Sequence, residues 1–155
     1  MNREIADHRN IWFLNTYVII RISARDGSDR ISVLEHRAPK GDSPPLHIHH
    51  DEDEIFHVLE GEVQYRVGDQ ERRTGPGEML LPPKGLPHTY RVVSDEARML
   101  TITRGEFENF IRTFGRPAER EGLPDASGPP TPEQAEALAR ACQQFGIELV
   151  GPPLT

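Results

Sequence analysis

Short apolar runs separated by turn residues recur along the first two thirds of the chain. Segment 62–67, EVQYRV, places Val63, Tyr65 and Val67 on one face and polar residues on the other. This alternation is the pattern of a half-buried strand. Further runs, each bounded by Gly, Pro or Asp, predict strands at 11–24, 30–36, 46–50, 54–61, 77–83, 88–94 and 97–103. The pattern therefore favours an all-β sandwich or barrel of antiparallel strands.

The spacing of apolar residues becomes helical after residue 103. Segment 105–115 carries phenylalanine and isoleucine at helical spacing, and Thr103 with Glu106 predicts a capping box at its start. Segment 131–146 begins Thr-Pro-Glu-Gln and ends at a glycine, which predicts a second helix with its own capping box. The tail, 147–155, is expected to cover an edge of the core or to reach a partner subunit.

This organisation predicts a β-barrel over residues 1–104 and a helical C-terminal extension, 105–155, packed on the barrel. A chain of 155 residues is long enough to bury a hydrophobic core without disulfides. Its 13 glycines and 14 prolines fit many short elements joined by turns.

Charge and cysteine content narrow the class of protein. The formal net charge is −7 with scattered acids, which argues against a nucleic-acid or anionic-membrane surface. The start of the chain lacks a basic-then-apolar signal pattern, and no apolar run is long enough to span a membrane. Cys142 is the single cysteine, so no internal disulfide is expected. These features together predict a cytoplasmic protein.

Three histidines and four acids fall within eight residues, HIHHDEDE, at 47–54. On a strand, His47 and His49 project from one face and His50 from the other. Glu54 follows a turn and is expected to begin a second strand that runs back beside the first. The set expected to work together in this stretch is therefore His47, His49 and Glu54.

A fourth candidate ligand, His88, comes directly after a turn rich in Pro and Gly. Three imidazoles and one carboxylate facing a barrel interior suit one divalent Fe, Mn, Ni, Co, Cu or Zn ion. Such a set leaves positions open for water or substrate, as in a catalytic site. The predicted metal ligands are His47, His49, Glu54 and His88.

The remaining histidines, His8, His36, His50 and His57, are expected to be surface or packed residues, because strand parity or position takes them away from this set. The acids 51–53 are expected to form a solvated loop. Cys142 is expected to be an inert, partly buried thiol, since no basic residue lies beside it in the sequence.

The spacing of these residues resembles the cupin superfamily. Its first motif matches at 41–61 and its second at 77–92, with Val92 where the family has asparagine. That asparagine is not a ligand in the family, so the difference leaves the ligand set intact. The matching patterns are Gly41-x5-His47-x-His49-x4-Glu54-x6-Gly61 and Gly77-x5-Pro83-x-Gly85-x2-His88. The run EIFHVLEGE, the segment GEFENFIRTFG and the tail look like single-domain bacterial cupins labelled quercetin dioxygenase-like.

The resemblance implies a jelly-roll β-barrel that holds one metal, with one or two peripheral C-terminal helices. The activity that it implies is a dioxygenase acting on a small enol, phenol or flavonol-like substrate, in which Glu54 ligates the metal or acts as general base. Two alternatives remain open: a non-oxidative isomerase, decarboxylase or lyase, and a small-molecule-binding barrel without turnover. The resemblance and the expected exposed strand edges also predict a homodimer.

Overall fold

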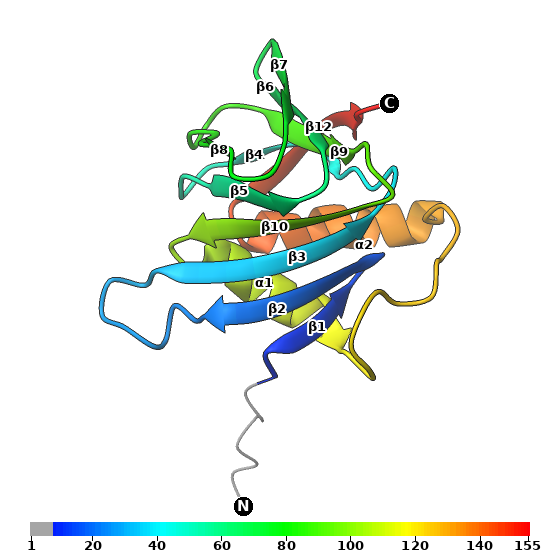
Figure 1. Ribbon diagram of the computed structural model, residues 1–155. Coiled ribbons are helices and arrows are strands. Elements are labelled where there is room, and N and C mark those ends of the chain that lie inside the picture. The colour runs from blue at the N-terminus through cyan, green and yellow to red at the C-terminus, as the bar shows by residue number, and fades with distance from the viewer. Residues whose placement is uncertain (1–7) are drawn as a thin grey trace, which may run out of the picture.

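The computed structural model describes residues 8–155. The prediction about a signal pattern concerns the first residues of the chain, and residues 1–7 lie outside the described range. Within that range the strands form one seven-stranded and one five-stranded sheet, and all pairings between strands are antiparallel (Figure 1). The expected all-β jelly-roll class with two C-terminal helices is confirmed.

The larger sheet has the strand order β11-β1-β2-β3-β10-β5-β8. Its strands are β1 (Asn10–Phe13), β2 (Thr16–Ile22), β3 (Ser32–Pro39), β5 (Ile55–Glu60), β8 (Met79–Leu80), β10 (Glu96–Thr103) and β11 (Arg116–Pro117). The smaller sheet has the order β12-β4-β9-β6-β7. Its strands are β4 (Pro45–His49), β6 (Val63–Val67), β7 (Gln70–Thr74), β9 (His88–Val92) and β12 (Ile147–Pro153).

Two of the differences between the predicted strands and the structure have a clear physical reason. The segment expected to be one strand at 11–24 is a hairpin, because Leu14 adopts a φ of 53° and the Thr16 hydroxyl donates to Phe13 O at 2.7 Å. Strand β7 was missed because Gln70–Thr74 is almost entirely polar. It lies at a sheet edge with four of its five residues exposed, so it carries no apolar alternation to detect.

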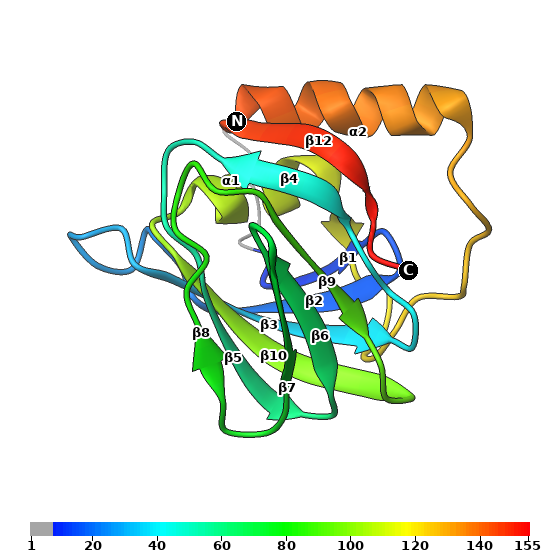
Figure 2. The same ribbon diagram turned by 90° about the horizontal axis from the view of Figure 1, so that it is seen from above.

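One of the two helices, α2 (Pro132–Gln144), lies beside β12 (Figure 2), and the other, α1 (Glu106–Phe114), packs against the larger sheet. Helix α2 begins with the predicted capping box, since the Thr131 side chain accepts from Gln134 N and the Gln134 side chain accepts from Thr131 N. The tail then returns as β12, which pairs with β4. The expectation that the tail covers an edge of the core is therefore confirmed, and residues 105–155 contribute strands to both sheets as well as the two helices. The division at residue 104 stays a prediction.

Helix α1 (Glu106–Phe114) has no side-chain cap of its own, so the capping box predicted for Thr103 and Glu106 is wrong. Gly105 holds the N-cap position with a φ of 101°, a conformation that favours glycine. The cap comes from Glu52 instead. Its carboxylate accepts hydrogen bonds from three backbone nitrogens: those of Arg104 and Phe107, both at 2.9 Å, and that of Glu106, at 3.2 Å.

This contact corrects the expectation that residue 52 lies in a solvated loop, because Glu52 is only 5% exposed. We expect Glu52→Gln to lower the free energy of unfolding by about 1–2 kcal/mol, since an amide has one acceptor oxygen and no charge to meet the helix N-terminus. Urea denaturation measures the change. The matched control is Asp51→Asn, an exposed neighbour, and an equal loss in both variants would contradict the capping role.

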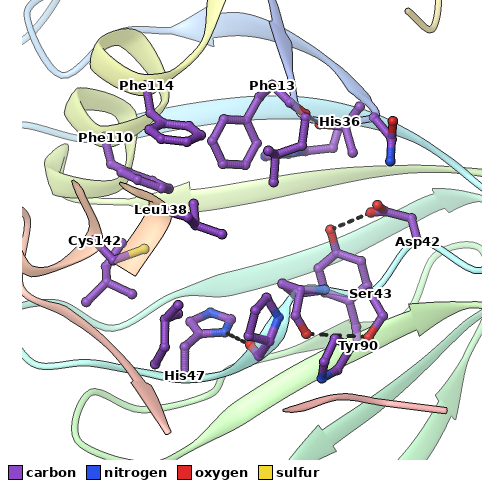
Figure 3. A pocket seen from close by; sticks show the side chains of 18 of the residues that line it. Phe13, His36, Asp42, Ser43, His47, Tyr90, Phe110, Phe114, Leu138 and Cys142 are labelled. Carbon is purple, nitrogen blue, oxygen red and sulfur yellow. Dashed lines mark hydrogen bonds between the residues drawn. The ribbon is translucent and has the colours of Figure 1, made fainter. Parts of the chain in front are cut away.

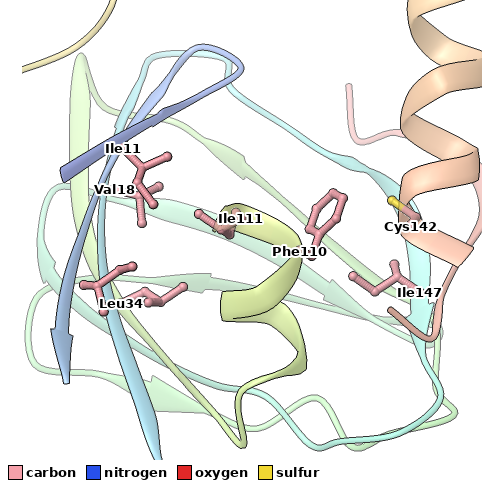
Figure 4. Packing of buried hydrophobic residues seen from close by; sticks show 8 residues of the cluster. Ile11, Val18, Leu34, Phe110, Ile111, Cys142 and Ile147 are labelled. Carbon is pink, nitrogen blue, oxygen red and sulfur yellow. The ribbon is translucent and has the colours of Figure 1, made fainter. Parts of the chain in front are cut away.

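Two clusters of buried apolar side chains hold the layers together. One lies inside the barrel between the two sheets and includes Phe56, Tyr65 and Met99. The other joins α1, α2 and β12 to the larger sheet, with Phe110 and Ile111 of α1 at its centre (Figure 4). The second cluster fixes α1 and α2 beside the barrel, and this arrangement shapes the cavity described below.

Candidate metal centre

The predicted ligands come together from β4, β9 and the loop before β5. His47 and His49 lie on one face of β4, and His47 is directly opposite His88 in the pairing of β4 with β9. Strand β5 begins at Ile55, one residue later than expected, so Glu54 lies directly before it. One ligand atom from each of His47, His49, Glu54 and His88 can be chosen so that all four lie within 4.8 Å of one another.

Nitrogens of these imidazoles lie close to one another and to the Glu54 carboxylate. His47 Nδ1 lies 2.7 Å from Pro45 O, and this backbone contact leaves Nε2 available. Nε2 of His88 lies 2.9 Å from Glu54 Oε2, and Nε2 of His49 lies 3.1 Å from the same oxygen without hydrogen-bond geometry. A buried imidazole nitrogen without a hydrogen-bond partner is costly, so this arrangement fits a set of metal donors.

Burial and charge act together on this cluster. Burial alone would raise the pKa of Glu54, but the neighbouring His49 and His88 outweigh it and hold that pKa well below its ordinary value. Burial would lower the pKa of His49, but the Glu54 carboxylate raises it. Burial, with the neighbouring His88 and His49, lowers the pKa of His47 to about 3. Three of the four side chains are almost fully buried, with exposures of 1–3%.

A cavity of about 670 Å³ opens beside this cluster. His47, His49 and Glu54 form part of its wall, and most of the remaining wall is apolar. Figure 3 shows Phe13, Phe110 and Phe114 gathered on one side and Leu138 and Cys142 of α2 on another. Burial raises the pKa of Cys142 to about 11, in keeping with the inert thiol expected. This volume and lining are typical of a site for a small, largely apolar molecule.

The other histidines lie outside the cluster, as expected, but one of them, His36, lines the cavity. His50 is exposed and contacts Glu148 at 2.7 Å, and His57 lies between two buried residues of β5, so its side chain points to the opposite face. His36 is buried and lines the cavity, stacked on Phe107 with ring centroids 5.9 Å apart. Its Nε2 has no hydrogen-bond partner among the described residues. The alternation of β3 places His36 on the inner face with Leu34 and Ala38, and this signal could have identified it.

Asp42 and Tyr90 also line the cavity. The sequence pattern gave no indication that Asp42 would lie there. The Tyr90 hydroxyl donates to Asp42 Oδ2 at 3.4 Å (Figure 3). Burial raises the pKa of Asp42 from 3.8 to about 6, although the hydrogen bond from Tyr90 opposes the shift. The ionised carboxylate is therefore held in the wall of the cavity at a cost to folding stability.

A raised pKa in the folded state gives a definite pH dependence. The folded form binds the proton more tightly than the unfolded chain, so the contribution of Asp42 to stability is most favourable below pH 3.8 and is lost as pH rises towards 6. We expect Asp42→Asn to raise the free energy of unfolding by about 1–2 kcal/mol at pH 8 and by much less at pH 4, after allowance for partial exposure. Urea denaturation at both pH values tests this. Asp95→Asn, a fully exposed control, should show no such difference.

Comparison with known proteins assigns the class. Residues 33–103 match the cupin domain family, a range that includes all four clustered side chains. Residues 33–103 therefore form a cupin domain. It is similar to quercetin 2,3-dioxygenase of Bacillus subtilis, with 33% identity over 105 residues that cover 66% of this chain and 31% of that protein.

The chain is also similar to two further proteins. Dimethylsulfoniopropionate lyase DddQ of Ruegeria pomeroyi is 31% identical over 93 residues, which cover 59% of this chain and 46% of that protein. The solved structure of a mutant of oxalate decarboxylase OxdC from Bacillus subtilis matches with a TM-score of 0.55 and 22% identity, covering 63% of this chain and 27% of that one. The latter likeness concerns the fold alone. The chain spans less than half the length of each of these relatives.

None of the helices within residues 8–155 is long and apolar enough to cross a membrane.

Proposed function

We propose that this protein is a metal-dependent cupin enzyme, with dioxygenation of a small enol, phenol or flavonol-like molecule as its leading activity. The observation that carries the proposal is the convergence of three imidazoles and one carboxylate in the wall of a largely apolar cavity. Similarity to quercetin 2,3-dioxygenase of Bacillus subtilis supports the choice of reaction.

The donor set fits a divalent transition metal. Metal–nitrogen bonds of about 2.0–2.1 Å place ligands of one ion roughly 3–4 Å apart, so donor atoms within 4.8 Å of one another need only small shifts. Three nitrogens and one oxygen suit Fe, Mn, Ni, Co, Cu or Zn. When bound, the metal would supply Lewis acidity that lowers the pKa of a substrate hydroxyl.

The protein's own groups have separable roles in this proposal. His47, His49 and His88 hold the metal, and the backbone contact of His47 with Pro45 fixes the orientation of that ring. Glu54 either completes the ligand set or accepts the proton of the substrate hydroxyl, because its carboxylate is ionised and lies at the cavity wall. The apolar side chains of the cavity exclude water from the bound substrate.

A non-oxidative lyase or decarboxylase is the second candidate. Similarity to the lyase DddQ of Ruegeria pomeroyi favours it, since the same ligand set and Lewis acidity serve either reaction. A third candidate is a barrel that binds a small molecule without turnover.

Oxygen uptake separates these candidates. Protein reconstituted separately with Fe, Mn, Ni and Cu is supplied with flavonols and β-diketones in an oxygen-electrode cell, beside Glu54→Gln and metal-free protein. We expect uptake that requires metal and falls strongly in Glu54→Gln. Cleavage products without oxygen uptake would favour the lyase, and binding without any product would favour the third candidate.

We also propose a cytoplasmic homodimer. The free thiol of Cys142 supports a reducing compartment. Strand β8 lies at an edge of the larger sheet, and Met79 and Leu81 are each 49% exposed there, which supports association through that edge. Size-exclusion chromatography with light scattering should give twice the mass of one chain, and a monomer would remove the dimer.

A further inference from the structure

Asp42 is an incompletely satisfied carboxylate in the wall of the cavity. Among residues 8–155, the hydrogen bond from Tyr90 at 3.4 Å is the only one its side chain accepts, and no cation pairs with it. A carboxylate has about four acceptor positions, so most of the capacity of Asp42 is unused. The remaining wall offers mainly apolar side chains. A ligand in this cavity therefore meets one strong acceptor away from the metal ligands.

The backbone holds this acceptor in place. Asp42 N donates to Pro39 O at 3.0 Å, and Asp42 O accepts from Val92 N at 3.0 Å, so the residue is tied to β9. The Tyr90 ring packs against Phe56 and Tyr65, with centroids 6.0 and 5.8 Å apart. Both partners of the hydrogen bond are therefore positioned before a ligand arrives, which reduces the entropy cost of binding.

The separation between the two polar parts of the cavity follows from strand geometry. Tyr90 lies two residues after His88 on the same face of β9. Two residues of strand cover about 7 Å, so the pair Asp42–Tyr90 is displaced from the metal ligands by the length of an aromatic ring or more. Phe56 is in ring contact with both strand positions, with its ring centroid 6.1 Å from that of His88 and 6.0 Å from that of Tyr90.

We propose that Asp42, oriented by Tyr90, is a specificity-determining residue. It selects ligands that carry metal-binding oxygens at one end, a planar apolar body, and a hydrogen-bond donor such as a hydroxyl at the far end. This inference rests on the proposed function, because it takes the metal to bind the near end. A site that presents a partly buried acceptor with unused capacity rejects an analogue that lacks the matching donor more strongly than an apolar wall does.

The test is a comparison of two ligands that differ by one hydroxyl. Zinc-loaded protein, which does not support oxygen chemistry, is titrated with 3-hydroxyflavone and with 3,4′-dihydroxyflavone, and the ratio of dissociation constants is measured. We expect wild type to bind the dihydroxy ligand at least about tenfold more tightly, and Asp42→Ala to reduce this ratio to near one. The affinity of Asp42→Ala for 3-hydroxyflavone should be equal to or higher than that of wild type, because the unmatched acceptor is gone, and a general loss of structure would lower it instead.

The matched control is Asp95→Ala, which removes a fully exposed carboxylate and should keep the wild-type ratio. Zinc content is measured in every sample. A ratio that is unchanged in Asp42→Ala, or absent in zinc-loaded wild type, overturns the role of Asp42 while the metal site stands. Absence of zinc in wild type overturns the proposed function and this inference with it.

Discussion

Replacement of His49 by alanine is expected to weaken divalent-metal binding by at least about a hundredfold. Loss of an outer-shell partner of a ligand already costs 10–100-fold in affinity, and His49 Nε2 belongs to the donor set itself. The side chain is 3% exposed and lies 3.1 Å from Glu54 Oε2, so the substitution also removes an imidazole that lies against that carboxylate.

Competition with a chromophoric chelator measures this affinity for Zn and Co. The control is His57→Ala, which removes an imidazole on the opposite face of β5 and should keep the wild-type affinity. Equal affinity in His49→Ala and wild type would show that metal binds elsewhere. A loss in both variants would point to damage to the barrel rather than to the ligand set.

Replacement of Glu108 by alanine is expected to lower the free energy of unfolding by about 3–5 kcal/mol. The carboxylate is 1% exposed and accepts from the hydroxyls of Ser23 and Ser32, both at 2.7 Å. It also accepts from Ala24 N at 2.9 Å and from Arg112 Nε at 3.0 Å. Removal of this carboxylate leaves these donors without their hydrogen-bond acceptor, and each buried donor left unsatisfied lowers the folding stability.

Urea denaturation monitored by circular dichroism measures the change. Glu106→Ala is the matched control on the same helix, because its ion pair with Arg30 is partly exposed and should contribute less than about 1 kcal/mol. A loss below 1 kcal/mol in Glu108→Ala would contradict the view that this network anchors α1 to the loop between β2 and β3.

The grouping of the four predicted ligands could be expected from the sequence because most of its signal is local. A spacing of two residues on a strand fixes the common face of His47 and His49, and a short turn places Glu54 beside them. His88 was identified by its residue type and by the turn before it, which do not show that it lies beside His47 and His49. The structure shows this, because His88 pairs with His47 across β4 and β9.

The features that the sequence did not reveal depend on contacts between distant segments. Glu52 caps α1 across more than 50 residues, and no local pattern distinguishes it from its solvated neighbours. Asp42 lies beside a cavity whose wall includes residues of α2, so its partial burial depends on the whole fold. The polar edge strand β7 has no hydrophobic face, since its pairing with β6 is made by the backbone.

Glu52 links the predicted metal site to the wall of the cavity. Glu52 joins the loop between His49 and Glu54 to the start of α1, and α1 carries Phe107 and Phe110 into the cavity. The position of the predicted ligands is thereby coupled to the shape of the apolar wall. Variation at residue 42 or residue 52 is expected to affect which small molecule fits the cavity, without any change in the four predicted metal ligands.

Elemental analysis of untagged wild-type protein by mass spectrometry tests the central claim most directly. We predict about one equivalent of Fe, Mn, Ni, Co, Cu or Zn per chain, carried by His47, His49, Glu54 and His88. Absence of any bound metal, even after incubation with each ion and removal of the excess, would contradict the account.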